Sequence, residues 1–134
     1  MVATQDKSSI LIAEDQEHVR EALAMLLRGH NYEVLLCASP GEALAAAQQS
    51  IPDLAMFDMN YQRDSTSGLE GLELIQRLRA LDSTVPIIAL TASAMKGDHQ
   101  KCLEVGCDGY LPKPIDFERL IATVARHLTL GDTA

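Results

Sequence analysis

Five short apolar runs, each followed by a stretch of helical spacing, constrain the fold of this chain more than any other feature. The runs cover residues 9–13, 32–37, 54–57, 86–90 and 109–111. Each is nearly continuous in apolar residues, which is typical of strands that are buried on both faces. Such strands in alternation with helices predict an α/β fold, a doubly wound parallel sheet covered by helices on both faces. Right-handed crossovers restrict its topology to a few choices.

The stretches between the runs carry apolar residues three and four positions apart, as amphipathic helices do. We expect helices over residues 19–27, 40–49, 74–81, 95–105 and 117–128, the fourth with the weakest apolar stripe. Ser39 and Glu42 form a capping-box pattern, with Pro40 at the first helical position. Asp116 is the expected N-cap of the last helix.

The length of the chain, 134 residues, suits one domain and leaves little room for a second. We expect residues 1–8 to be a disordered N-terminal segment, residues 9–129 to form the domain and residues 130–134 to be a tail or linker stub. No apolar run approaches the roughly 18–20 residues that cross a bilayer, and the polar start does not resemble a signal peptide. These features predict a cytoplasmic protein without membrane association.

Acidic residues outnumber basic ones by 19 to 11, which gives a net charge of −8. Such a chain repels phosphate backbones, so we expect no direct binding to nucleic acid. Its three cysteines, Cys37, Cys102 and Cys107, are odd in number and irregularly spaced. This pattern argues against a disulfide framework and against a zinc site. Cys37 lies in an apolar run, where we expect a small buried side chain.

Polar residues stand at the carboxyl ends of four of the five predicted strands. Glu14 and Asp15 follow the first strand, Asp58 ends the third, Thr91 ends the fourth and Lys113 follows the fifth. In a parallel sheet these ends share one edge, where ligands bind, so we expect one shallow pocket. Three carboxylates this close repel one another unless a cation lies among them. Oxygen ligands of this kind are suited to Mg²⁺.

The same residues suit phosphoryl chemistry. Asp58 can act as a nucleophile on phosphorus, Lys113 can neutralise a phosphate oxygen, and Thr91 can donate a hydrogen bond to another. Each residue alone also fits an ordinary role, since Asp15 and Thr91 could cap helices and Lys113 could be a solvated surface residue. Because packing does not require complementary groups from four strands at one edge, their combination favours a functional site.

The motifs around these residues resemble those of receiver domains of bacterial two-component response regulators, of the chemotaxis-regulator kind. The similarity runs from about Ser9 to Leu128. It rests on four motifs: Ile-Leu-Ile-Ala-Glu14-Asp15, Leu-Ala-Met-Phe-Asp58-Met-Asn60, Ala-Leu-Thr91-Ala92 and Gly-Tyr110-Leu-Pro-Lys113-Pro114. The resemblance implies a receiver domain over residues 9–129 with a (βα)5 fold and the sheet order 2-1-3-4-5.

The resemblance also implies a metal site. Asp15 and Asp58 would ligate Mg²⁺, or Mn²⁺ in its place, with Glu14 acting through water and Asn60 through its backbone carbonyl. Asn60 and Ser93 would help to set the lifetime of the phosphoryl group. The loop over residues 61–71 is longer than is usual in the family and lacks its common proline, so its role stays open.

Further roles are implied for the last two motifs. Thr91 and Lys113 would hold the phosphoryl oxygens. Tyr110 would be the aromatic switch that turns inward with Thr91 after phosphorylation. The Lys113–Pro114 peptide bond is expected to be cis, although only about 5–6% of X–Pro bonds in folded proteins are.

The function that follows is a phosphorelay switch. A histidine kinase or histidine phosphotransfer protein would present a phosphohistidine, and Asp58 would accept its phosphoryl group in a Mg²⁺-dependent step. The surface of the fourth helix, fifth strand and fifth helix would then change for an unknown downstream protein or output domain. The chain would be a regulatory domain that promotes only its own phosphoryl transfer and autodephosphorylation, not an enzyme.

Two other functions stay open. A Mg²⁺-dependent phosphohydrolase of the haloacid-dehalogenase type also uses an aspartate nucleophile, but it needs a second Asp two positions later, where this chain has Asn60. A docking module that takes no phosphoryl group is the other alternative. All five residues of the predicted site are intact, which argues against it: Glu14, Asp15, Asp58, Thr91 and Lys113.

Overall fold

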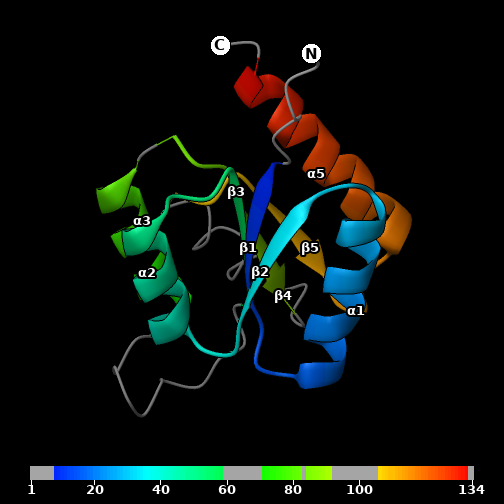
Figure 1. Ribbon diagram of the computed structural model, residues 1–134, viewed down its shortest axis with the longest axis horizontal. Coiled ribbons are helices and arrows are strands. Elements are labelled where there is room, and N and C mark those ends of the chain that lie inside the picture. The colour runs from blue at the N-terminus through cyan, green and yellow to red at the C-terminus, as the bar shows by residue number, and fades with distance from the viewer. Residues whose placement is uncertain (1–7, 59–70, 83, 92–105, 133–134) are drawn as a thin grey trace, which may run out of the picture.

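The computed structural model of this chain describes residues 8–58, 71–82, 84–91 and 106–132 (Figure 1). Its strands are β1 (Ser9–Ala13), β2 (Glu33–Cys37), β3 (Leu54–Asp58), β4 (Ile87–Thr91) and β5 (Gly109–Pro112). Its helices are α1 (Glu17–Gly29), α2 (Pro40–Gln49), α3 (Gly71–Leu81) and α5 (Phe117–Asp132). The helix predicted over 95–105, residues 61–70 of the predicted loop and Cys102 lie outside the described residues, whereas Gly71, expected to end that loop, begins α3.

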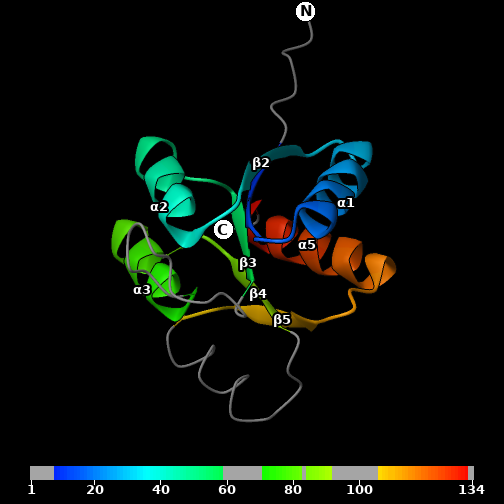
Figure 2. The same cartoon turned by 90° about the horizontal axis from the view of Figure 1, so that it is seen from below.

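The five strands form one parallel sheet in the order β2-β1-β3-β4-β5, which confirms the predicted doubly wound topology. Figure 2 shows α1 and α5 on one face of the sheet and α2 and α3 on the other. The chain runs outward from β1 to β2 and then returns to β3, so strand order reverses between β1 and β3. In folds of this class, ligands bind beyond the carboxyl ends of the strands at such a reversal.

Two hydrophobic clusters, one on each face of the sheet, make up the core. Ile10 and Ile12 of β1 lie in the cluster beneath α1 and α5, while Leu11 and Ala13 lie in the cluster beneath α2 and α3. All five residues of β3 are buried. This two-sided burial explains the continuous apolar runs, and each fully buried Leu or Ile contributes roughly 1.5–3 kcal/mol.

The predicted caps of two helices are present. The Ser39 hydroxyl accepts a hydrogen bond from the Glu42 amide at 3.2 Å, and the Glu42 carboxylate accepts one from the Ala38 amide at 3.2 Å. The Asp116 carboxylate accepts hydrogen bonds from the amides of two residues in the first turn of α5. The N-cap of α1 is Gln16, so Asp15 does not take the capping role that was open to it.

Element boundaries differ from the sequence prediction by one to four residues at several ends, and local structure explains the difference at two points. The helix α5 continues to Asp132, three residues into the segment expected to be a tail. The apolar stripe ends near Leu128, but a backbone helix can extend past it, since glycine costs only about 1 kcal/mol in a helix. At the other point, β2 begins at Glu33 because Tyr32 still belongs to the turn after α1, where its amide bonds to the Leu27 carbonyl.

No helix among the described residues is both long enough and apolar enough to cross a membrane.

Candidate functional site

The candidate site lies at the carboxyl ends of β1, β3 and β5, the lower edge of the sheet in Figure 1. The β1–β3 register pairs Ala13 with Phe57, so the next residues, Glu14 and Asp58, emerge side by side. The Glu14 amide donates a hydrogen bond to the Cys37 carbonyl at 3.0 Å, which extends the pairing of β1 with β2 by one residue. The pairing of the backbone therefore fixes the positions of Glu14 and Asp58.

Lys113 joins the two buried carboxylates. Its Nζ lies 2.8 Å from Glu14 Oε1 and 3.2 Å from Asp58 Oδ2. The Glu14 and Asp58 side chains are 0% and 2% exposed, and that of Lys113 is 18% exposed. The Lys113–Pro114 peptide bond is cis, the isomer that the resemblance implies. One cation thus reaches two carboxylates that are shielded from water.

Asp15 completes a group of three carboxylates. One oxygen each from Glu14, Asp15 and Asp58 lies within 4.8 Å of the others. Asp15 is exposed while the other two are buried, so the group opens to solvent on one side. In an octahedral Mg²⁺ site with metal–oxygen distances of about 2.0–2.1 Å, ligand oxygens lie roughly 3–4 Å apart. The donor set and its spacing therefore fit a hard divalent cation with several water ligands.

Burial and neighbouring charges perturb the ionisation of the site. Burial raises the pKa of the Glu14 carboxyl group from its ordinary 4.5 to about 7; the Lys113 ammonium opposes this and the Asp58 carboxylate adds to it. Burial alone would lower the pKa of Lys113, but the carboxylates of Glu14 and Asp58 outweigh it and raise that pKa. Lys113 is therefore held as a cation. Any further positive charge nearby would favour the ionised form of the Glu14 carboxyl group.

Arg20 is a supporting residue that the sequence analysis missed. Its guanidinium donates to the backbone carbonyls of Glu14 at 2.9 Å and Asp15 at 3.4 Å, so α1 fastens the loop that carries both acidic residues. A signal was present in the sequence: a long cationic side chain stands in the first turn of the helix that follows the acidic pair.

The other predicted site residues are described only in part. Thr91 ends β4 and is paired in register with Pro112 of β5, but its side chain lies outside the described residues. Asn60 and Ser93 lie outside them altogether. Tyr110 on β5 is half-buried and packs against the core cluster beneath α2 and α3.

Comparison with known proteins identifies the family. Residues 10–125 match the sequence profile of the response regulator receiver domain, which is most of the chain. The chain belongs to this family. It is therefore a receiver domain of a two-component response regulator, and the family is regulatory. Receiver domains generally bind Mg²⁺ through acidic residues and interact with histidine kinases and downstream effectors.

Several known proteins are similar to this chain over nearly its full length. The polar-differentiation response regulator DivK of Brucella ovis is 36% identical over 120 residues, which cover 90% of this chain and 95% of DivK. The solved chemotaxis protein CheY4 of Vibrio cholerae is 28% identical with a TM-score of 0.82, and the match covers 90% of this chain and 98% of CheY4. A CheY-like receiver domain from Methanospirillum hungatei is 26% identical with a TM-score of 0.87, covering 96% and 98%.

Proposed function

We propose that this receiver domain is a phosphorelay switch in which Asp58 accepts the phosphoryl group. The observation that carries the proposal is the position of Asp58, buried at the end of β3 with Lys113 Nζ at 3.2 Å. Its carboxylate also lies in one group with those of Glu14 and Asp15. This combination of nucleophile, fixed cation and metal-binding oxygens matches what phosphoryl transfer requires, namely positioning and charge stabilisation.

The reaction proceeds by attack of an Asp58 carboxylate oxygen on the phosphorus of a phosphohistidine. A new P–O bond forms as the P–N bond breaks, and the electron pair of the P–N bond stays on the ring nitrogen. The imidazole leaves as a neutral ring because its other nitrogen carries a proton. Lys113 offsets negative charge on a phosphoryl oxygen, with Thr91 as hydrogen-bond donor to another. The donor is a histidine kinase or a histidine phosphotransfer protein in the cytoplasm.

The acidic group would hold the metal ion. Asp15 and Asp58 would contribute carboxylate oxygens, Glu14 would act through water and Asn60 through its backbone carbonyl. Mg²⁺, or Mn²⁺ in its place, supplies positive charge that compensates for the incoming phosphoryl group. Asn60 and Ser93 help to set how long the phosphoryl group persists on Asp58.

The signal passes along the sheet to a surface for an unknown downstream partner. Thr91 and Pro112 are paired residues of β4 and β5, and Tyr110 stands two residues before Pro112. Movement of Thr91 toward the phosphoryl group and of Tyr110 inward changes the surface that includes β5 and α5. The proposal thus assigns a regulatory role rather than turnover of an external substrate.

A titration with beryllofluoride and Mg²⁺ tests the proposal, because this anion stands in for a phosphoryl group on a carboxylate. We expect amide resonances at the carboxyl edge of the sheet and around Tyr110 to shift in the wild type. Asp58→Ala should abolish these shifts, while the control Glu21→Gln, which changes an exposed carboxylate on α1, should keep them.

Other outcomes would contradict the proposal or favour a different function. Shifts that persist in Asp58→Ala would contradict the assignment of the acceptor. A folded protein that binds neither Mg²⁺ nor beryllofluoride would favour a docking module. Rapid multiple turnover of small phosphate esters would favour a phosphohydrolase.

A further inference from the structure

The strand β2 is an edge of the sheet, and its outer side pairs with no strand that the structure describes (Figure 2). The Glu33 amide and the Cys37 carbonyl both bond to residues that flank β1. Because successive residues of a paired strand direct their backbone groups to alternate sides, Val34 and Leu36 direct theirs outward. The N–H and C=O groups of both residues therefore face away from the sheet.

The sequence of β2 favours pairing with a further strand. It reads Glu-Val-Leu-Leu-Cys, with one charge and neither proline nor glycine. Leu35 stands in its middle and is 52% exposed. The other edge strand, β5, begins with glycine and ends with proline, and both residues disfavour such pairing. An edge of the β2 kind is a template for association unless it is protected.

Arg28 occupies one of the outward groups of β2. This residue lies in the last turn of α1, and its Nη2 donates to the Val34 carbonyl at 3.1 Å. The Val34 amide and both backbone groups of Leu36 bond to no part of the chain that the structure describes. A second strand that used the Val34 carbonyl would displace the guanidinium and cover a charge that had lost its acceptor, which costs free energy.

The outward groups of β2 are complementary to those of a second copy. In an antiparallel pair of two β2 strands centred on Leu35, Val34 of each copy faces Leu36 of the other. These two residues exchange N–H···O=C bonds in both directions. Leu35 then faces Leu35 of the second copy at the closely spaced position of the ladder, where side chains lie nearest to one another.

We propose that the bond from Arg28 to the Val34 carbonyl prevents two copies of this chain from joining through β2. The edge is thereby kept unpaired without a proline or a bulge. Association with a partner or a second copy then uses other surfaces of the domain. Neither Arg28 nor β2 contributes to the carboxylate group, so the proposal does not rest on the proposed function.

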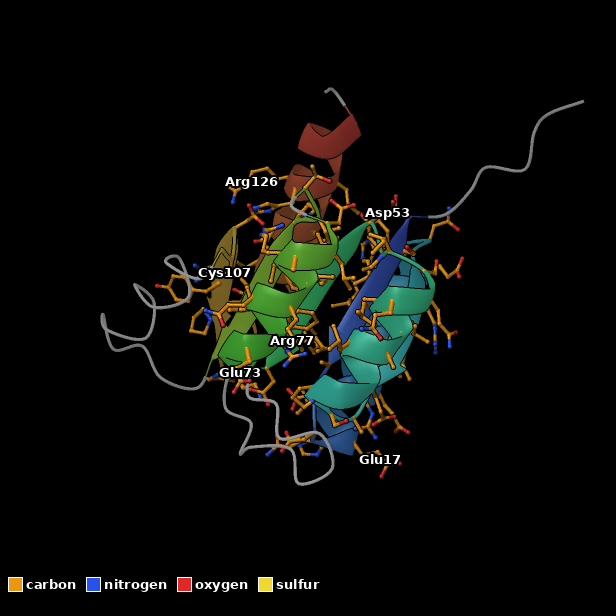
Figure 3. All side chains as sticks on the ribbon, turned by 90° about the vertical axis from the view of Figure 1, so that its left-hand side faces the viewer. Glu17, Asp53, Glu73, Arg77, Cys107 and Arg126 are labelled. Carbon is orange, nitrogen blue, oxygen red and sulfur yellow. The ribbon has the colours of Figure 1, made fainter. Side chains whose placement is uncertain are left out.

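Sedimentation equilibrium tests the proposal, at about 0.15 M salt so that the repulsion between two chains of charge −8 is screened. We expect Arg28→Ala to strengthen self-association by about 10–100-fold over the wild type, on the scale of one hydrogen bond in each copy. The control Arg77→Ala removes the same charge from an exposed site and should stay at the wild-type level. Arg77 lies on α3, which covers the opposite face of the sheet from α1 (Figure 3).

Two further readouts locate the association at β2. Hydrogen exchange of the Val34 and Leu36 amides should slow in Arg28→Ala as dimers form, because both amides gain acceptors. Leu35→Lys added to Arg28→Ala places like charges opposite each other across the pair and should restore the wild-type level. Leu81→Lys adds the same charge at an exposed leucine of α3 and should not restore it.

The proposal fails if Arg28→Ala associates no more strongly than Arg77→Ala. Association of Arg28→Ala that Leu35→Lys leaves unchanged would also overturn it, as would a wild type whose Val34 and Leu36 amides are already protected in a dimer. Thermal melting followed by circular dichroism establishes that each variant is folded. The measurements need no beryllofluoride, so they decide the role of Arg28 independently of Asp58.

Discussion

At the scale of single residues, the buried carboxyl group of Glu14 serves the charge arrangement of the site and not the stability of the fold. Its pKa in the folded protein is about 7 against an ordinary 4.5, so the folded state holds this proton more tightly than the unfolded state does. The free energy of unfolding of the metal-free protein therefore falls as pH rises from about 4.5 to about 7.

Glu14→Gln removes this titration and keeps a polar side chain of similar shape. We expect the variant, in EDTA, to melt at a higher temperature than the wild type at pH 8, where Glu14 is ionised. The difference should shrink at pH 5, where both side chains are neutral in the folded state. Thermal unfolding followed by circular dichroism measures this, with Glu21→Gln as the exposed control; a wild type more stable than Glu14→Gln at pH 8 would contradict the account.

Cys37 provides a second prediction at this scale. It is buried as predicted, and burial together with the charge of Glu42 raises the pKa of its thiol from 9.0 to about 11. Because the thiolate is the reactive form, iodoacetamide at pH 8 should modify Cys37 slowly in the folded protein and rapidly in denaturant. Mass spectrometry of the peptide that contains Cys37 follows the rate, and similar rates in both states would contradict its burial.

At the scale of elements, the capping box fixes where α2 begins. Ser39→Ala removes the hydroxyl that accepts from the Glu42 amide, and we expect a loss of about 1 kcal/mol in the free energy of unfolding. Ser50→Ala at the other end of α2 is the matched control, because Ser50 uses its backbone amide, which bonds to the Ala46 carbonyl. Urea unfolding of both variants shows whether the loss of stability comes from the missing cap hydrogen bond or from any exchange of serine for alanine.

The Arg79 side chain joins α3 to the segments that precede β4 and β5. From α3 its guanidinium donates to the Gly106 carbonyl at 2.7 and 2.9 Å and to the Val85 carbonyl at 2.6 Å, and it pairs with Asp108 at 2.6 Å. A lysine cannot reproduce this planar set of donors. We therefore expect Arg79→Lys to lower the free energy of unfolding by about 2 kcal/mol.

Arg77→Lys changes the neighbouring exposed arginine in the same way and serves as the control for Arg79→Lys. Urea unfolding should show little change for Arg77→Lys. Equal stability of the two variants would mean that the bonds from Arg79 contribute nothing beyond an exposed charge.

At the scale of the whole molecule, the sheet and the position of its site followed from the sequence because burial on both faces leaves a strong pattern. Glu14, Asp58 and Lys113 could be assigned to one edge because parallel strands place their carboxyl ends together. The bonds from Arg79 to the turn before β5 could not be predicted, since they join residues up to 29 positions apart with no local signal. The extension of α5 past Leu128 was missed because the apolar residues at helical spacing end there, while the backbone helix continues to Asp132.

The central claim is that Asp58 accepts the phosphoryl group, and chemical location of that group tests it most directly. The protein is incubated with acetyl phosphate and Mg²⁺, reduced with borohydride, which converts an aspartyl phosphate to homoserine, and digested for mass spectrometry. We predict homoserine at position 58, its loss when Mg²⁺ is removed with EDTA, and none in Asp58→Ala. Homoserine at any other aspartate, or a folded wild-type protein that gains no phosphoryl group, would contradict the account.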